Sequence, residues 1–427
     1  MIPRFAVVGH PNKGKSSIVS TLSEDAAVAI APIPGTTTAA RTFPMQVDGE
    51  TLYELIDTPG FQRPREVLAW LHERSGGAAD RAATVARFVA AHAGDPRFHD
   101  ECELLRLITE GAGILYVVDG SRPYGAEYEP EMEILRWTGR PRMALINLIA
   151  HGDHIEEWQR ALDQYFSIVR VFDALHADVS KRLTLLRSFG ELHPPWQAGI
   201  ARAVNALEDD YRRRRERAAR AITALIVDAL TLQVSQRIAE DADPAPVIAS
   251  AQERLRQRLA EREQKVRREV EAIYRHEGAV WADGAPAVID SELFSSASEQ
   301  LFGLSRTQLV ATGAMSGAVT GGAIDLALGG GVSALLGGDR LGKAKVLGQS
   351  LGSREITVGP FRDTNLPWVL LGRALLHHEA IAERNHARRD AIVMAVADGG
   401  HRANAIEPVL RKCLAREALV AEVLQIV

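Results

Sequence analysis

Eight residues near the start of the chain have the types and spacing that bind a phosphate chain. They run Gly9-His10-Pro11-Asn12-Lys13-Gly14-Lys15-Ser16 and fit the pattern G-x-x-x-x-G-K-[ST]. In this pattern backbone N–H groups face the phosphates, the lysine reaches the β- and γ-phosphates, and the hydroxyl binds Mg²⁺. Residues 5–8 read as the strand that must precede such a loop, and residues 17–22 as the helix that must follow it. The spacing therefore predicts a nucleotide site with Mg²⁺ as its cofactor.

Two later segments have the composition of nucleotide-sensing switches. Pro34-Gly35-Thr36-Thr37-Thr38 offers threonine hydroxyls that can bind Mg²⁺. Residues 52–56 read as a strand that ends in Asp57-Thr58-Pro59-Gly60. Asp57 at this strand end is expected to orient a water molecule on the metal. Gly60 can turn its N–H towards a γ-phosphate, and loss of that contact on hydrolysis is how such a switch works.

The three motifs together resemble the TrmE–Era–EngA–septin group of translation-factor-related GTPases, over roughly the first 195 residues. The resemblance implies an α/β P-loop G domain, a mostly parallel sheet flanked by helices, that hydrolyses GTP to GDP and phosphate. It assigns Thr37 as the switch threonine that binds Mg²⁺, and Thr36, one residue earlier, is the alternative. It also matches Asn12 to an asparagine that helps hold K⁺ in cation-dependent members. The other interpretation of Asn12 is a turn residue.

The motifs and the resemblance together give a set of candidate site residues. The catalytic ones are Lys15, Thr37 and Gly60, and the metal ligands are Ser16, Thr37 and Asp57. The nucleotide-binding residues are Gly9, Pro11, Asn12, Lys13, Gly14, Lys15, Ser16, Ser17, Thr36, Thr37, Asp57, Gly60 and Asn147.

The base-reading motif of that family, Asn-Lys-x-Asp, is changed in this chain. After the expected fifth strand, residues 142–146, the sequence reads Asn147-Leu148-Ile149-Ala150. An apolar side chain cannot accept hydrogen bonds from guanine, and such bonds make base discrimination strong. Asp153 could substitute only in a remodelled loop, and the last base-contacting loop is expected at residues 173–177. Phe61 stands where Ras-like proteins carry a water-positioning glutamine, so slow intrinsic turnover is expected.

Composition indicates a globular chain of two domains. It has 427 residues, of which 46% are hydrophobic and 25% charged. Its two cysteines exclude a disulfide framework. A net charge of −5 gives no overall attraction to nucleic acid. Because the first strand begins close to Met1, we expect no signal peptide and a cytoplasmic location.

We expect residues 1–195 to form the G domain, with a helical insertion at about 61–110. The arginines of this insertion are interpreted as a solvated helix face, although one could reach the γ-phosphate; they are Arg63, Arg65, Arg74, Arg81 and Arg87. Residues 196–427 should be mainly helical and resemble a bacterial domain of uncharacterised function that follows such G domains. Long helices are expected at about 200–240 and 247–276. In the second, five apolar residues form a narrow packing seam, namely Leu255, Leu259, Val266, Val270 and Ile273.

A glycine-rich apolar segment at about 307–338 is the most unusual part of the second half. Gly313, Gly317 and Gly321 recur every four residues, which lets helices approach closely in membranes. Asp325 and the glycines at 329–331 argue against a single spanning helix, so a hairpin of two short helices is expected. Contact of this hairpin with the inner face of the plasma membrane is favoured over burial in a soluble domain. Further on, a helix beginning at Leu366 is expected to continue through the basic residues 384–389.

Three functions are consistent with these features. The favoured one is a membrane-associated GTPase whose nucleotide state controls the hairpin. The second is an RNA- or ribosome-associated GTPase that binds through the arginine-rich residues 212–217. The third is a nucleotide-binding scaffold with relaxed base specificity and little hydrolysis. A homodimer formed through the G domain or the long helices is a further expectation about partners.

Overall fold

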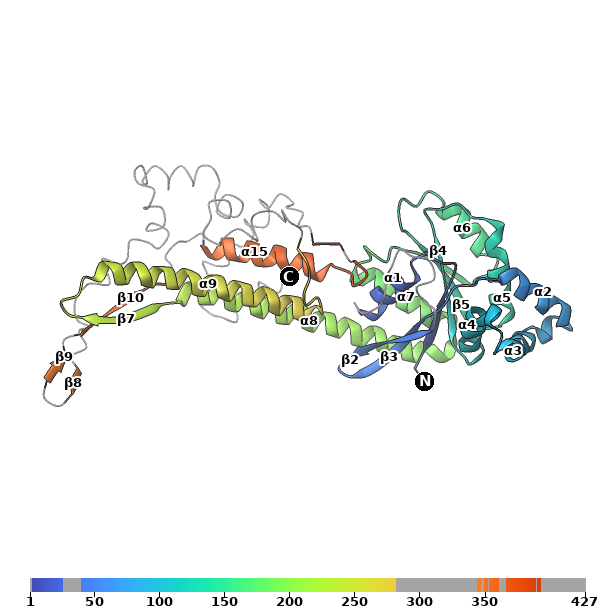
Figure 1. Cartoon of the computed structure of the whole chain (residues 1–427), viewed down its shortest axis with the longest axis horizontal. Coiled ribbons are helices and arrows are strands. Elements are labelled where there is room, and N and C mark those ends of the chain that lie inside the picture. Colours follow the sequence, from blue (N-terminus) through green and yellow to red (C-terminus); the bar gives the residue numbers. More distant parts are fainter. Residues whose placement is uncertain are drawn as a thin grey trace. The chain divides into compact units, whose positions relative to one another are not determined.

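The computed structural model describes residues 2–25, 40–281, 344–346, 349–351, 353–360, 366–388 and 390–392 (Figure 1). The chain forms two compact units. The first unit contains Met1–Arg212 and Glu383–Arg389, and the second contains Arg213–Ala382 and Asp390–Val427. This division differs from the expected boundary at 195/196. The first turns of helix α8 (Gln197–Thr231) place Ile200 and Val204 in the core of the first unit, beside Phe189 and Trp196.

A six-stranded sheet forms the centre of the first unit, in the order β2-β3-β1-β4-β5-β6. The strands are β1 (Arg4–Val8), β2 (Arg41–Val47), β3 (Glu50–Asp57), β4 (Gly113–Asp119), β5 (Arg142–Asn147) and β6 (Ile168–Phe172). Edge strand β2 is antiparallel to β3, and the remaining neighbours are parallel. Strands β1, β4 and β5 are almost wholly buried, which suits parallel strands covered on both faces.

Side chains alternate between two apolar cores, one on each face of this sheet. Phe5 and Val7 of β1 point into a core made with α1 (Lys15–Ser23), α7 (Val179–Leu192) and the start of α8. Ala6 and Val8 point to the opposite core. Five helices build that second core, namely α2 (Pro64–Arg74), α3 (Arg81–His92), α4 (His99–Thr109), α5 (Glu129–Trp137) and α6 (Ile155–Leu162). Helices therefore cover both faces of the sheet, and the loops that follow its strands are attached to a packed scaffold.

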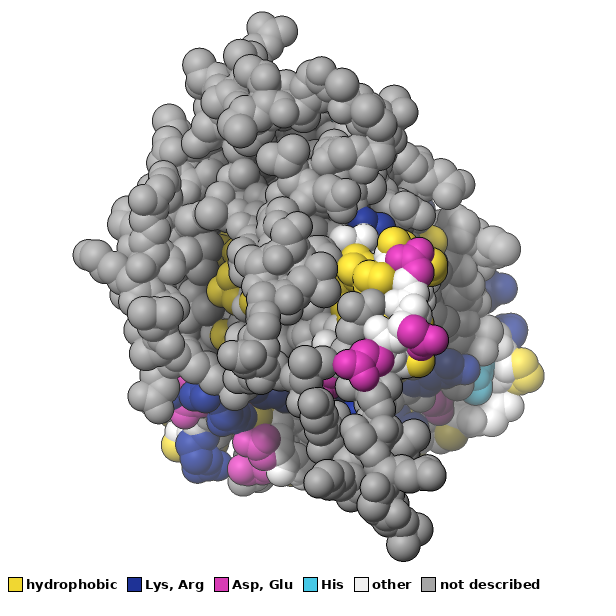
Figure 2. Space-filling view, turned by 90° about the vertical axis from the view of Figure 1, so that its left-hand side faces the viewer, with side chains coloured by type: hydrophobic (Ala, Val, Ile, Leu, Met, Phe, Trp, Pro, Cys, Tyr) yellow, Lys and Arg dark blue, Asp and Glu magenta, His cyan; other side chains and the backbone are white. Residues whose placement is uncertain are grey.

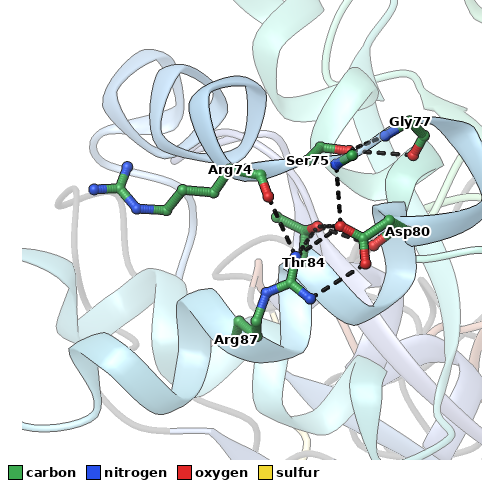
Figure 3. A network of polar contacts seen from close by, with 7 residues as sticks. Arg74, Ser75, Gly77, Asp80, Thr84 and Arg87 are labelled. Carbon is green, nitrogen blue, oxygen red and sulfur yellow. Dashed lines mark hydrogen bonds and ion pairs between the residues drawn. The ribbon is translucent and has the colours of Figure 1, made fainter.

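The insertion expected at about 61–110 contains α2, α3 and α4, and a polar network joins the first two (Figure 3). Asp80 accepts hydrogen bonds from Arg87 at 2.7 Å, from Thr84 at 3.0 Å and from the Gly76 N–H at 3.2 Å. Arg87 also donates to the Arg74 carbonyl that ends α2, at 3.3 Å. The hydrogen bond from Arg87 lowers the pKa of Asp80 well below its usual range. The Arg87 guanidinium is thus engaged within the insertion.

Helices dominate the described part of the second unit. The rest of α8 packs with α9 (Pro244–Ile273) and α15 (Leu366–Ala382) around one core. The five seam residues expected on the second long helix are all buried in it, with Leu255 and Leu259 at 0% exposure. Within this core Glu263 pairs with Arg373 at 2.7 Å and with Arg267 at 2.6 Å. Strands β8 (Ala344–Val346) and β9 (Gln349–Leu351) form a separate hairpin.

The first long helix was expected to run to about residue 240, and this is wrong. Helix α8 ends at Thr231, and residues Val234–Ala239 form strand β7. This strand pairs antiparallel with β10 (Ser353–Val358), more than a hundred residues further along the chain. The backbone hydrogen bonds of the remote pairing, together with burial of Val234 and Ile238, override a local helical pattern.

The glycine-rich segment at about 307–338 lies outside the described residues. Within the part of the chain that the structure describes, no helix combines the length and the apolar character needed to cross a bilayer. Figure 2 shows acidic side chains close to hydrophobic ones, with Lys and Arg side chains lower in the same view. The described side chains visible on this face therefore carry charges of both signs.

Candidate nucleotide-binding site

The predicted phosphate loop, residues 9–16, connects the end of β1 to the start of α1. Gly14 lies directly before α1 with a φ of 83°, a left-handed conformation that favours glycine. A Cβ at this position would overlap the side-chain nitrogen of Asn147. Gly14 is therefore required both by its backbone conformation and by the close approach of Asn147.

Lys15 is the first residue of α1, and its ammonium group lies back over the loop. Its Nζ donates to the carbonyl oxygens of Gly9 at 2.9 Å and His10 at 3.1 Å, and the residue is only 9% exposed. Burial lowers the pKa of Lys15, while the carboxylates of Asp57 and Glu131 raise it. The cation is thus held inside the loop at the point where a phosphate chain would carry the opposite charge.

Ser16, near the start of α1, and Asp57, at the end of β3, come together beside the phosphate loop. The Ser16 hydroxyl donates to Asp57 Oδ2 at 2.8 Å. The position of Asp57 follows from the register of β3, in which it pairs with Val7 of β1. A hydroxyl and a carboxylate are the hard oxygen ligands that Mg²⁺ prefers, so this pair fits the expected ion.

Gly60 lies against the phosphate loop. A Cβ added to it would be 2.9 Å from the Gly9 carbonyl oxygen and 3.2 Å from Pro11 Cδ. The preceding turn is fixed by Thr58, whose hydroxyl donates to the Val7 carbonyl at 2.8 Å. A side chain at position 60 would therefore push this segment away from the phosphate loop.

Asn147 ties the phosphate loop to the loop that follows β6. Its side-chain nitrogen donates to the Lys13 carbonyl at 3.2 Å, and its side-chain oxygen accepts from the Ala174 N–H at 3.3 Å. The Ala174 carbonyl in turn accepts from Thr21 of α1 at 2.7 Å. Asn147 is 3% exposed, so this asparagine is a buried connector between the two loops.

The changed positions of the base-reading motif are more open to solvent than Asn147. Leu148 is half-buried, whereas Ile149 and Ala150 are exposed. Asp153, considered as a substitute acceptor, is exposed as well. Asn147 thus connects two loops in this structure, and an apolar side chain stands at position 150, where the family motif has a carboxylate.

Other expected site residues lie around the loop or outside the described residues. Asn12 is exposed and has a φ of 62°, and Ser17 is half-buried on α1. Thr36 and Thr37 lie outside the described residues. Among the arginines of the insertion, Arg63 pairs with Glu66 and Arg74 with Glu73, and Arg81 lies over the Trp137 ring.

Sequence reasoning did not find the groups that support the phosphate loop from α5 and from Tyr128, the residue before it. Glu131 is 0% exposed and accepts hydrogen bonds from the Tyr116 hydroxyl at 2.9 Å and from His10 Nδ1 at 3.0 Å. The Lys13 ammonium lies 5.5 Å from the ring centre of Tyr128. Glu131 and His10 are far apart in the chain, so no local pattern could have indicated their contact.

A second missed residue, Glu101 of α4, contacts the segment just after Gly60. Its Oε1 accepts from the backbone N–H groups of Gln62 at 2.8 Å and Arg63 at 2.6 Å. Glu101 is 1% exposed. Because these N–H groups precede helix α2, the carboxylate also lies where the helix dipole favours a negative charge. The insertion therefore anchors the residues that directly follow Gly60, the segment expected to act as the second switch.

Comparison with known proteins agrees with this arrangement. Residues 159–422, more than half of the chain, match the family model described as Domain of unknown function (DUF3482). The chain belongs to the DUF3482 family. Residues 4–148 match the model described as 50S ribosome-binding GTPase, which confirms the resemblance of the first half to P-loop GTPases. DUF3482 begins inside α6, so its match extends into the first unit.

Individual relatives cover only part of this DUF3482 chain. GTPase Der from Azoarcus sp. (strain BH72) is 26% identical over 245 residues, which are 57% of this chain and 44% of Der. GTPase Der from Herminiimonas arsenicoxydans is 44% identical over 65 residues, 15% of this chain and 14% of Der. The chain thus spans less than half the length of these relatives. A variant of Era from Aquifex aeolicus, solved bound to GDP.AlF4⁻, has 16% identity and a TM-score of 0.32, over 65% of this chain and 90% of that one.

Proposed function

We propose that this protein binds GTP and GDP, hydrolyses GTP to GDP and phosphate with Mg²⁺, and acts as a nucleotide-dependent switch. The observation that carries the proposal is the joint placement of Lys15, Ser16 and Asp57 at the carboxyl ends of β1 and β3. The match of residues 4–148 to a GTPase family supports the same conclusion.

Each side chain has a definite part in the proposed reaction. Lys15 exchanges its two carbonyl partners for phosphate oxygens and, with the loop N–H groups, stabilises charge as water attacks the γ-phosphate. Gly60 donates its N–H to that phosphate. Bound Mg²⁺, with Ser16 and Thr37 as ligands and Asp57 orienting its water, would neutralise charge on the phosphate oxygens. Asn12 would contact a K⁺ ion. Measuring the rate of GTP hydrolysis in KCl and in NaCl tests this contact.

Base choice is the decisive test of the proposal. We expect calorimetric titration of nucleotide-free protein to give GDP binding at least about a hundredfold tighter than ADP binding, both with Mg²⁺. The physical reason is that buried Asn147 and the loop after β6 keep their mutual hydrogen bonds without the aspartate. Equal affinities for the two nucleotides would contradict the assignment as a GTP switch and support a nucleotide-binding scaffold with relaxed base specificity.

A variant that puts a carboxylate back at position 150 can be compared with the unsubstituted protein. Because Ala150 is exposed, Ala150→Asp should fold with little change in stability. If position 150 faces the base, this carboxylate accepts hydrogen bonds from guanine and increases the preference for GDP over ADP. An unchanged preference would place the base away from residues 147–150.

Membrane association through residues 307–338 is the second part of the proposal, and its support is the glycine spacing of the sequence. We expect deletion of residues 309–336 to abolish co-sedimentation with anionic liposomes and to leave GTP hydrolysis unchanged. Equal co-sedimentation of the full chain and the deletion variant would contradict this part alone.

A further inference from the structure

Residues 383–389 return to the first unit after the chain has passed through the second. The sequence pattern predicted one helix from Leu366 through residues 384–389, but α15 ends at Ala382. The residues that follow, Glu383–Arg389, belong to the first unit. Asn385, His386 and Ala387 are 1%, 4% and 3% exposed, so the middle of this short segment is buried. We refer to residues 383–389 as the return segment.

Asn385 makes the specific contact of the return segment. Its side-chain nitrogen donates to the carbonyl oxygens of Leu175 and Ala177, each at 3.0 Å. An amide nitrogen has two N–H groups, so both are used. These bonds explain why α15 ends at Ala382. If the helix continued through residue 385, the Asn385 side chain would lose its hydrogen bonds to the two carbonyl oxygens of the distant loop.

The loop that Asn385 contacts, residues 173–177, is the one expected to approach the nucleotide base. It has its own internal bonds, since Asp173 Oδ1 accepts from the N–H groups of Leu175 at 2.9 Å and His176 at 3.1 Å. Asn147 holds the Ala174 N–H and also the Lys13 carbonyl of the phosphate loop. A continuous series of hydrogen bonds therefore runs from the return segment through this loop to the phosphate loop.

We infer that Asn385 is a positioning residue for the base-contacting loop, so that binding of a guanine nucleotide and docking of the return segment stabilise each other. This inference rests on the proposed function, because it takes the nucleotide to be a guanine nucleotide bound beside residues 173–177. Coupling between two sites is reciprocal, so a nucleotide that tightens the loop tightens the docked segment equally. The return segment follows α15 directly in the sequence.

Substitution of Asn385 tests the positioning role in the full-length protein. Asn385→Ala removes both donors, and loss of two hydrogen bonds should weaken GDP binding by about tenfold or more. Binding of Mg²⁺-pyrophosphate, which uses the phosphate loop without a base, should change by less than about twofold. Glu383→Ala is the matched control, because Glu383 lies in the same segment and is exposed. It should leave both affinities as in the unsubstituted protein.

The outcomes separate this inference from the proposed function. If unsubstituted protein binds no GDP, both fail. The inference alone fails if the unsubstituted protein binds GDP and the Asn385→Ala variant binds GDP equally well. It also fails alone if Asn385→Ala weakens the binding of GDP and of pyrophosphate by the same factor. A second measurement needs no variant: saturating GDP should slow amide hydrogen exchange in residues 383–388 of the full-length protein. Exchange that is the same with and without GDP would overturn the coupling.

Discussion

Lys15→Ala is expected to reduce GTP hydrolysis by at least about a hundredfold, the cost of removing one strong electrostatic contact to the transition state. The other lysine of the loop, Lys13, has its ammonium 5.5 Å from the ring centre of Tyr128, whereas the Lys15 ammonium donates to the Gly9 and His10 carbonyls. The fold should survive, since the helix it begins is held in the core by Ile18, Val19 and Leu22. Single-turnover hydrolysis and the thermal unfolding midpoint are the two measurements.

Lys181→Ala is a suitable control for that experiment. It also removes a lysine from a helix of the first unit, but the Lys181 side chain is 68% exposed and pairs only loosely with Asp178, at 3.8 Å. Turnover of this variant should equal that of the unsubstituted protein. If Lys15→Ala folds and keeps turnover within about threefold of normal, the assignment of the phosphate loop is wrong.

Glu101→Ala is expected to lower the rate of hydrolysis by about ten- to a hundredfold while GDP affinity stays nearly constant. The variant loses two charge-assisted hydrogen bonds to the Gln62 and Arg63 N–H groups. Burial of Phe61 remains, but the segment after Gly60 loses its backbone anchor at Gln62 and Arg63, so the Gly60 N–H spends less time towards the γ-phosphate. GDP has no γ-phosphate, so its binding should not depend on this anchor.

The glutamine variant distinguishes anchoring from charge. Glu101→Gln keeps a carbonyl oxygen that can accept the same two N–H groups, so it should retain most of the rate that alanine loses. The measurement is kcat and KM for GTP, with GDP affinity determined alongside. A folded Glu101→Ala protein with normal kcat would show that the insertion does not hold the second switch in its working position.

Residues whose role is set by close neighbours in the chain could be predicted from the sequence. The phosphate loop, the strand before it and the helix after it follow from residues 5–22, and the five buried seam residues of α9 follow from helical periodicity. Thr36 and Thr37 stay predictions because they lie outside the described residues.

The rest depends on pairs that are remote in sequence. Strand β7 forms because β10 is available to pair with it, and a local pattern of apolar residues cannot contain that information. Glu101, Glu131 and Asn385 support the site from α4, α5 and the return segment, at sequence separations of 38 to 210 residues. A lone Glu or Asn has no signature in one sequence, because its partners are backbone groups that every residue carries.

The return segment has a practical consequence for work on separate parts of this protein. A fragment ending at Arg212 would contain the whole sheet and the phosphate loop but would lack Asn385. Supplying residues 383–389 as a free peptide would not repair it at ordinary concentrations, because the intact chain holds the segment at a high effective concentration. Nucleotide selectivity measured on such a fragment would describe a different binding site from that of the intact chain.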